Sequence, residues 1–110
     1  MMKKTGIGTA VLALMVAPSM FAAGSADEGK VTFMKRCAAC HAEDGNGKEA
    51  VAKMMNTTIP PLPSKEVQAL SDDEIRKVIT EGKEKMKPVK DLSAADVTNL
   101  IAFIRSLAKK

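Results

Sequence analysis

The only two cysteines and the only histidine of the chain lie together in the run Cys37-Ala38-Ala39-Cys40-His41. Two cysteines separated by two residues and followed directly by histidine form the attachment signature of c-type haem. In that chemistry each thiol adds across one vinyl group of the porphyrin, and the adjacent imidazole supplies an axial ligand to the iron. The motif therefore predicts one haem c, with its iron, held covalently by Cys37 and Cys40 and ligated by His41.

A Cys-x-x-Cys pair has three other common functions, and the rest of the chain supports them less well. A thioredoxin-type redox pair requires a surrounding βαβ pattern, which this sequence lacks. A structural zinc site requires four ligands, whereas the chain has only three cysteine and histidine side chains in total. A disulfide between Cys37 and Cys40 would close a very small ring and would stabilise the fold little.

Residues 1–26 have the organisation of a secretory signal peptide. Lys3 and Lys4 form a positive segment, and an apolar stretch follows it before a proline and an end made of small residues. The apolar stretch is shorter than a helix that spans a membrane normally is. We predict cleavage after Ala26, with Gly24 as the alternative, export to the periplasm, and no stable membrane insertion of the processed chain.

Cleavage would leave residues 27–110 as one small domain. The chain has 17 basic and 13 acidic residues, and the signal contains two of the lysines and no acid, so the domain carries a net charge of +2. This balance, together with the lack of any Tyr or Trp that could stack on bases, predicts no nucleic acid binding. A domain of this size struggles to build an adequate apolar core, which a covalent haem would supplement.

Apolar periodicity predicts an all-α fold. The expected helices span about residues 27–39, 49–55, 71–81 and 93–107, and no stretch alternates as a strand. Ser25 and Glu28 have the spacing of a capping box at the start of the first helix. Cleavage after Ala26 would remove Ser25 and leave Asp27 as the cap, and the sequence leaves both possibilities open.

The later helices have clearer ends. Ser71 and Glu74 form a second capping box, and Gly82 is the expected terminator of that helix. Ser93 is the expected cap of the last helix. Between the second and third helices, residues 59–63 must leave helical geometry, because each proline restricts the residue before it.

The pattern resembles a monohaem class I cytochrome c, a small electron carrier of the bacterial periplasm. Gly29 and Phe33 match the small and aromatic positions of that family's N-terminal helix, and Leu100-Ile101-Ala102-Phe103 matches its C-terminal helix. The resemblance covers nearly all of residues 27–110. It implies the small cytochrome c fold, in which the terminal helices cross while short helices and loops surround one covalent haem. Glycine allows close approach at such a crossing, and aromatic rings seal it.

The resemblance also implies that the second axial ligand is a methionine in the loop before the last helix, which here is Met86. Pro88 follows it two places on, rather than immediately as is frequent in the family. A thioether suits the soft ligand set of haem iron and raises the reduction potential relative to harder donors. Met54 and Met55 are predicted to serve in packing, and Met34 lies on the wrong side of the motif.

A proline segment after the motif completes the resemblance. Pro60 is followed two residues later by Leu62, which is similar to the family's Pro-x-Leu segment. There the proline carbonyl accepts a hydrogen bond from the proximal imidazole and fixes its orientation. The resemblance implies this role for Pro60 toward His41, with Pro61 as the alternative.

With both axial positions filled, the iron has no open site, so we expect one-electron transfer between respiratory redox partners and no enzymatic activity. Lysines flank Met86 and are interleaved with acidic residues; they are Lys83, Lys85, Lys87 and Lys90. They predict a basic surface for transient docking of acidic redox proteins by a monomeric carrier.

Two alternative functions stay open. If Met86 is weakly bound or displaced, the haem would bind small ligands or react with peroxide. The chain would also look the same if it were a soluble haem subunit of a larger oxidase or dehydrogenase.

Overall fold

The computed structural model describes residues 24–108. All of the predicted signal peptide except its last three residues therefore lies outside the described part. Within that part the chain forms α2 (Ala26–Arg36), α3 (Ala38–His41), α4 (Glu49–Met54), α5 (Lys65–Gln68), α6 (Asp72–Glu81) and α7 (Ala94–Ser106). Residues 24–108 contain no strand beyond an isolated bridge between Lys83 and Met86. The predicted all-α class is confirmed.

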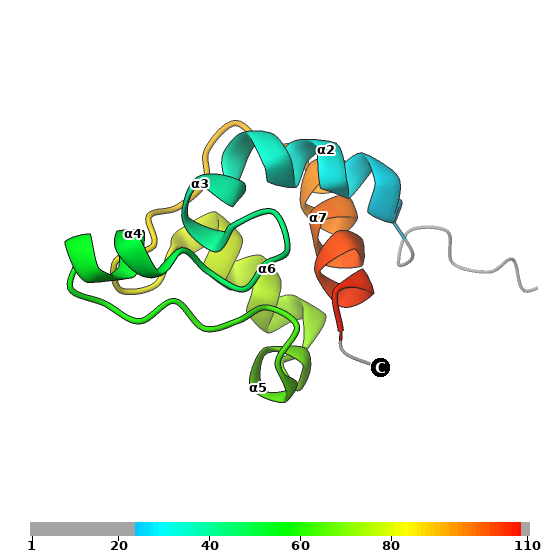
Figure 1. Ribbon diagram of the computed structural model, residues 1–110. Coiled ribbons are helices and arrows are strands. Elements are labelled where there is room, and N and C mark those ends of the chain that lie inside the picture. Colours follow the sequence, from blue (N-terminus) through cyan, green and yellow to red (C-terminus); the bar gives the residue numbers. More distant parts are fainter. Residues whose placement is uncertain (1–23, 109–110) are drawn as a thin grey trace, which may run out of the picture.

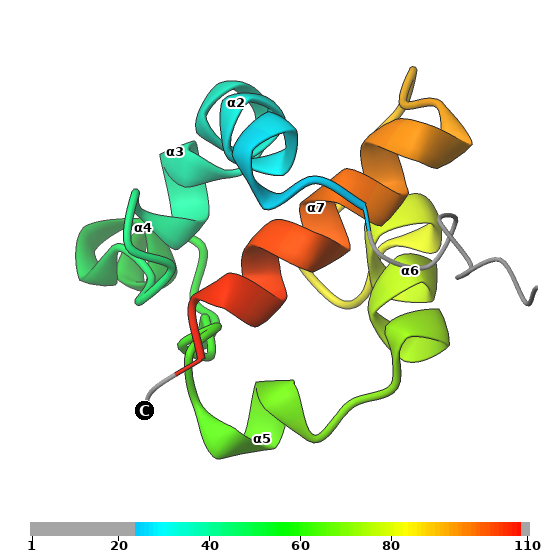
Figure 2. The same cartoon turned by 90° about the vertical axis from the view of Figure 1, so that its right-hand side faces the viewer.

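The first and last of these helices, α2 and α7, cross and pack against each other. Figure 1 shows α2 lying across the upper end of α7, and in Figure 2 α7 runs diagonally through the middle with α2 above it and α5 and α6 below. Gly29 is buried at the crossing, where an added Cβ would overlap the Asn99 carbonyl oxygen. The rings of Phe33 and Phe103 lie 4.9 Å apart between centroids and are tilted by 50°. Glycine therefore lets the two backbones approach, and the aromatic pair fills the remaining space.

The apolar core extends from this crossing toward α6. Phe33 and Leu100 are fully buried, and the α6 side chains Ile75 and Ile79 are buried with them. The buried residues of α7 (Val97, Leu100, Ile101 and Ile104) and of α6 (Ile75 and Ile79) recur every three or four positions, so each helix packs with one apolar face.

The caps of the later helices lie where the sequence predicts them. The Ser71 hydroxyl accepts from the Glu74 N–H while the Glu74 carboxylate accepts from the Ser71 N–H, a complete capping box. Ser93 makes the same reciprocal pair with Asp96 at the start of α7. Gly82 ends α6 with φ of 82°, a conformation that favours glycine.

Ser25 caps the first helix. Its hydroxyl accepts from the Glu28 N–H at 3.1 Å, and its own N–H donates to Asn99 Oδ1 on α7 at 2.8 Å. Of the two caps considered from the sequence, Ser25 or Asp27, the folded chain uses Ser25.

Two local features differ from the sequence-based expectation. The predicted continuous helix to residue 39 is wrong, because the chain breaks at Cys37, with φ of −123° and ψ of −31°, and restarts as α3. The four-residue helix α5 was not predicted. Its N-cap is Ser64, whose hydroxyl accepts from the Val67 N–H. A helix of one turn is too short to show a 3.6-residue period.

Candidate haem-binding site

The break at Cys37 gives the Cys-x-x-Cys-His motif its local geometry. The Cys37 carbonyl accepts from the N–H groups of Cys40 at 3.2 Å and His41 at 3.0 Å, so the motif closes into the single turn of α3. Residues three and four apart share one face of a helical turn. All three chemically active side chains of the motif consequently line the same cavity.

This cavity has a volume of about 640 Å³, within the range of roughly 300–1,000 Å³ that is usual for cofactor sites. Its walls come from α2 and α3, the 55–62 segment, α5 and α6, the 83–89 segment and α7. They are largely apolar and include Leu62, Val67, Ile75, Ile79, Leu100 and Ile104. An apolar cavity of this size with one histidine and two cysteines on its wall suits a porphyrin with an iron centre.

His41 has the environment of a metal-binding imidazole. Burial lowers the pKa of its ring, which favours the neutral form that ligates iron. Its Nδ1 atom is buried, and within residues 24–108 it has no hydrogen-bond partner. Buried ring nitrogens are normally satisfied, because an unmade hydrogen bond leaves the cost of desolvation uncompensated. The histidine therefore fits the proximal side of a haem, where one nitrogen meets the iron and the other seeks an acceptor.

Cys37 and Cys40 are unpaired thiols. Burial raises the pKa of Cys37 to about 11; nearby Arg36 opposes the rise, and Cys40 adds to it. A thiol with a raised pKa is a poor thiolate for disulfide exchange or zinc coordination. Residues 24–108 also contain no group of three or more His, Cys, Asp and Glu arranged to hold a metal ion by themselves. This environment agrees with the attachment motif better than with its redox-pair and zinc alternatives.

A tight hairpin presents Met86 to the cavity. The Lys83 N–H donates to the Met86 carbonyl and the Met86 N–H donates to the Lys83 carbonyl, both at 2.9 Å. Glu84, at the tip, has φ of 53°, and an added Cβ on Gly82 would come within 2.7 Å of the Met86 carbonyl oxygen. Beyond the hairpin, the Val89 N–H donates to the Ile79 carbonyl at 2.9 Å and ties the segment to α6.

The four methionines outside the predicted signal have different surroundings. Met86 and Met55 both line the cavity, Met54 is 78% exposed, and Met34 packs partly buried against the core. The sequence predicts only a packing role for Met55. It does not indicate that Met55 lines the cavity, because an apolar residue in a cavity wall and one in the core have the same sequence pattern. The structure thus leaves two thioethers near the predicted haem, of which Met86 is the predicted ligand.

The two candidate prolines, Pro60 and Pro61, differ in their position relative to the cavity. Pro60 lines the cavity and Pro61 is not among the lining residues. Leu62 follows as a buried wall residue whose N–H donates to the Gly45 carbonyl at 2.9 Å. Neither proline carbonyl bonds His41 in this structure, so the role of Pro60 stays a prediction.

The mouth of the cavity is charged. Lys83, Lys85 and Lys87 of the hairpin line it and are exposed, with Glu84 between them. Lys90 lies outside the lining, and its carbonyl accepts from the Arg36 guanidinium at 3.0 Å. Of the four lysines predicted as a docking surface, Lys83, Lys85 and Lys87 therefore lie on the Met86 side of the cavity, and Lys90 does not line it.

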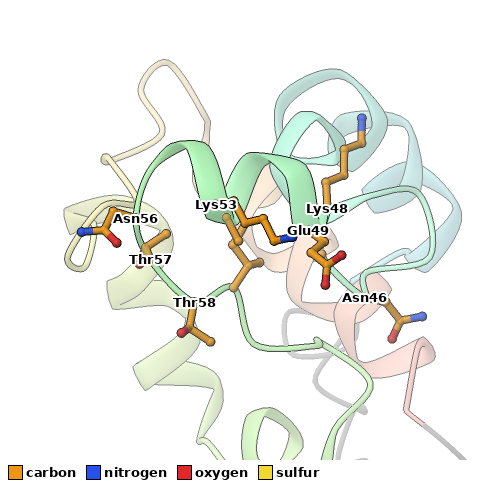
Figure 3. Close-up of a pocket in the computed structure, with 10 residues that line it drawn as sticks. Asn46, Lys48, Glu49, Lys53, Asn56, Thr57 and Thr58 are labelled. Atoms are coloured by element: carbon orange, nitrogen blue, oxygen red, sulfur yellow. The ribbon is translucent and has the colours of Figure 1, made fainter.

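A second hollow of about 480 Å³ lies against α4 (Figure 3). Its lining includes Lys48, Glu49 and Lys53, with Thr57 and Thr58 shared with the first cavity. It contains no cysteine, histidine or methionine, and no predicted site residue lies in it.

Comparison with known proteins identifies the class. Residues 24–104 match the family described as "Cytochrome C oxidase, cbb3-type, subunit III". A solved structure of KustC0563 c-type cytochrome aligns with a TM-score of 0.64 and 28% sequence identity, covering 74% of this chain and 98% of that one. No curated protein gives a significant match.

The protein is a small c-type cytochrome with an all-helical fold. In particular, the chain belongs to the cytochrome c family matched by residues 24–104. The family implies a covalently attached haem c and indicates haem-based electron transfer, and thus an electron carrier rather than an enzyme. No helix in the described part of the chain is long and apolar enough to cross a membrane.

Proposed function

We propose that the protein is a one-electron carrier with one haem c, attached through Cys37 and Cys40 and ligated by His41 and Met86. The observation that carries this proposal is the convergence of the motif and the Met86 hairpin, far apart in sequence, on one apolar cavity of about 640 Å³. When bound, haem supplies a one-electron couple between ferric and ferrous iron. Both axial positions would then be taken by protein side chains, which leaves no iron site for a substrate.

The chain's own residues would set the conditions of electron transfer. His41 would donate the lone pair of Nε2, and Met86 would donate a thioether lone pair from the hairpin. Leu62, Ile75 and Ile79 belong to the apolar wall of the cavity. This wall would keep water from a bound haem, which would favour the less charged ferrous state and raise the potential. We propose that the Pro60 carbonyl is the acceptor for His41 Nδ1, because Pro60 is the proline that lines the cavity.

We further propose that the partners are redox proteins with acidic docking surfaces. Lys83, Lys85 and Lys87 surround the cavity mouth, where a partner must approach to exchange electrons with the haem. Charge complementarity of this kind accelerates encounter while leaving the complex short-lived. Rates of reduction by an acidic partner are expected to fall steeply with added salt. A flat salt response would contradict the proposed docking surface.

The proposed setting is the periplasm, reached through a cleaved signal peptide, with the protein acting as a monomer. Lys3, Lys4 and the apolar stretch after them support export.

A second candidate function is supported by the matched family, whose description names a subunit of an oxidase. The chain would then serve as the haem subunit of a larger complex. Size-exclusion chromatography of extracts from the native cells separates the two: a free carrier elutes at the size of the single chain, and a subunit co-elutes with oxidase activity.

The decisive experiment uses protein expressed in a strain that matures c-type haem. A pyridine haemochrome spectrum after acid extraction is expected to report one covalent haem per chain. Ferric wild type is expected to show the methionine–iron charge-transfer band in the red, and Met86→Ala is expected to lose it. Met55→Leu is the matched control, because Met55 also lines the cavity. If Met55→Leu loses the band and Met86→Ala keeps it, the ligand assignment is wrong.

Carbon monoxide tests the ligand-binding alternative on the same sample. Reduced wild type at neutral pH is expected not to bind carbon monoxide, because Met86 would hold the iron site that carbon monoxide would need. Ready binding would instead support the function with Met86 displaced.

A further inference from the structure

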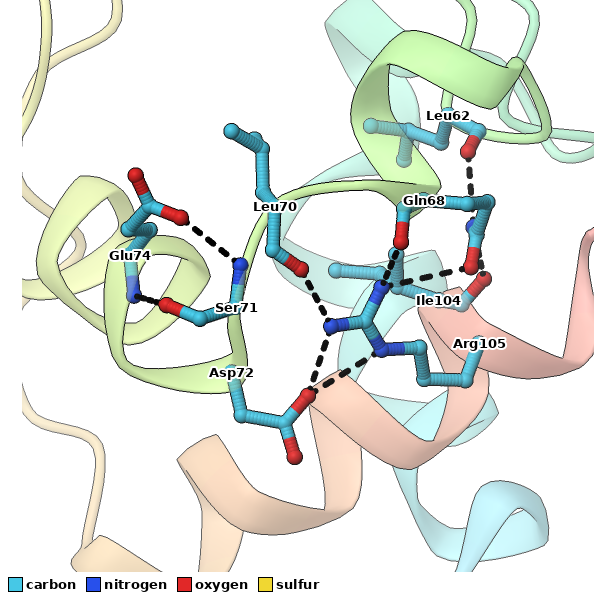
Figure 4. A network of polar contacts seen from close by, with 8 residues as sticks. All are labelled: Leu62, Gln68, Leu70, Ser71, Asp72, Glu74, Ile104 and Arg105. Atoms are coloured by element: carbon cyan, nitrogen blue, oxygen red, sulfur yellow. Dashed lines mark hydrogen bonds and ion pairs between the residues drawn. The ribbon is translucent and has the colours of Figure 1, made fainter.

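A polar network joins the end of α7 to the segment between α5 and α6 (Figure 4). The Arg105 guanidinium donates to two backbone carbonyls, Gln68 at 2.9 Å and Leu70 at 2.6 Å. It also contacts Asp72 Oδ1 through Nε at 3.1 Å and Nη2 at 2.8 Å. One arginine therefore holds the turn that connects two helices.

Gln68 extends the network toward the haem-binding cavity. Its Nε2 donates to the Leu62 carbonyl at 2.9 Å and to the Ile104 carbonyl at 3.0 Å. Its Oε1 accepts from Arg105 Nη1 at 3.4 Å. Both amide hydrogens and the amide oxygen are used, so the orientation of this side chain is fixed from three directions.

The network acts on the backbone of the cavity wall from behind. Leu62, Leu70 and Ile104, whose carbonyls accept these bonds, all line the cavity, whereas Gln68, Asp72 and Arg105 do not. The network therefore touches no bound ligand directly.

The Leu62 peptide is held at both ends. Its N–H donates to Gly45, and its carbonyl accepts from Gln68. Pro60 lies two residues earlier and lines the cavity, and His41 Nδ1 is buried without a hydrogen-bond partner in the described chain. Any displacement of Leu62 would move the Pro60 carbonyl, the acceptor that we propose for His41.

We infer that Gln68 and Arg105 are positioning residues that hold the 59–62 segment and thereby set the reduction potential of the haem. The inference rests on the proposed function, since it requires a haem ligated by His41. The orientation of a ligating imidazole and the exclusion of water by the surrounding wall both tune a metal's potential. Gln68 acts on the segment directly, and Arg105 acts through Gln68.

The Arg105–Asp72 ion pair is not the basis of this role. The two side chains are 31% and 55% exposed, and an ion pair with that much solvent contributes little. The bonds to backbone carbonyls at the cavity wall are the ones that fix geometry, so charge reversal at Asp72 is a poorer test than removal of the Gln68 amide.

The test uses the exported holoprotein and two readouts besides stability. Gln68→Leu keeps a side chain of similar size and removes both donors. It is expected to lower the reduction potential, because a loosened wall admits water and favours the ferric state. It should also speed exchange of the His41 ring N–H proton, measured by NMR on the ferrous protein, because the acceptor proposed for that proton would be held less firmly.

Arg105→Lys is a milder variant that guards against a failure to fold, and it should shift both readouts in the same direction by less. Arg76→Gln is the control, since Arg76 also connects α6 to α7 through a 3.5 Å contact with Thr98 but touches no cavity wall. The control should match wild type in both readouts.

A lower melting temperature for Gln68→Leu with wild-type potential and exchange would reduce the network to fold stabilisation and overturn the inference. A changed potential with unchanged His41 exchange would overturn the route through the 59–62 segment. Failure of the proposed function is distinguished by the wild-type sample itself, which would then lack covalent haem or the methionine–iron band.

Discussion

The crossing of α2 and α7 and the Met86 hairpin are stabilised in opposite ways. At the crossing, Gly29, Phe33, Leu100 and Phe103 are buried against one another. In the hairpin, residues 83–85 are exposed and Met86 is only half-buried. Two backbone hydrogen bonds and the turn at Gly82 define its shape.

This difference in burial indicates which part of the fold depends on the haem. The crossing has an apolar core of its own, because side chains from both helices fill it. The hairpin has almost no core and faces the cavity with Met86. We therefore expect the crossing to be stable on its own contacts. If Met86 binds the haem iron as we propose, the hairpin gains much of its order from that bond.

Removing the haem attachment is the strongest way to separate the two regions. Cys37→Ala combined with Cys40→Ala should abolish covalent haem, as judged by the pyridine haemochrome after acid extraction. Hydrogen exchange should then become fast across residues 83–89 while α2 and α7 keep slower exchange. Ala39→Ser, inside the same motif, is the control that retains haem. Equal loss of protection in both regions would contradict the comparison.

Disrupting the crossing should have the next largest effect. Gly29→Val places a branched side chain where a Cβ already overlaps the Asn99 carbonyl, and overpacking of this kind costs about 3 kcal/mol of unfolding free energy. Urea denaturation of the holoprotein measures the loss. Lys30→Ala, one residue on and exposed, should change stability by at most about 0.5 kcal/mol. A Gly29→Val protein as stable as wild type would show that the helices do not need this close approach.

The processed N-terminus tests how far the crossing extends. Ser25 caps α2 and donates its N–H to Asn99 of α7, and losing an N-cap of this kind costs about 1 kcal/mol. Cleavage after Ala26, the predicted site, would remove this cap, whereas the alternative cleavage after Gly24 would retain it. The sequence predicts that the exported protein has the intact mass of a chain beginning at Asp27, and a chain beginning at Ser25 would contradict that prediction. A chain beginning at Asp27 would show that the crossing tolerates the loss of this cap.

A smaller effect is expected at the tip of the hairpin. Glu84 has φ of 53°, a conformation that strains a residue with a Cβ and suits glycine. Glu84→Gly should raise the unfolding free energy by about 0.5 kcal/mol, since relief of strain slightly exceeds the entropic cost of glycine. Lys85→Gly, at the next position and without a positive φ, should lower it by a similar amount. Thermal melts measure the stability of the two variants. If Glu84→Gly were less stable than Lys85→Gly, the backbone angle at residue 84 would carry no strain.

The smallest effect is a pH dependence at the start of α6, outside both regions. The Ser71 N–H, helped by the Ser71 hydroxyl and Lys83, lowers the pKa of the Glu74 carboxyl below its ordinary 4.5. A lowered folded-state pKa stabilises the fold above pH 4.5, and this stabilisation is lost as pH falls through the lower value. Glu74→Gln should therefore show a slightly flatter loss of stability than wild type on acidification.

Much of this architecture could be read from local residue patterns. The caps at Ser71 and Ser93 and the terminator Gly82 lie where the sequence predicts, because each is decided within about one helical turn. Gly29 and Phe33 lie at the crossing that the resemblance to the cytochrome c family implies. The break at Cys37 and the short α5 were missed, because a single turn has no periodicity to detect.

The candidate site likewise has features that the sequence predicts and features that only the structure shows. The sequence by itself determined the haem chemistry, because Cys37, Cys40 and His41 are neighbours in the chain and their spacing is the signal. Only the tertiary structure decided that Pro60 rather than Pro61 lines the cavity and that Met55 reaches it beside Met86. It alone placed Arg105 and Gln68 behind the cavity wall. These relations join residues far apart in sequence, and the path of the chain, which no local pattern specifies, sets which of them meet.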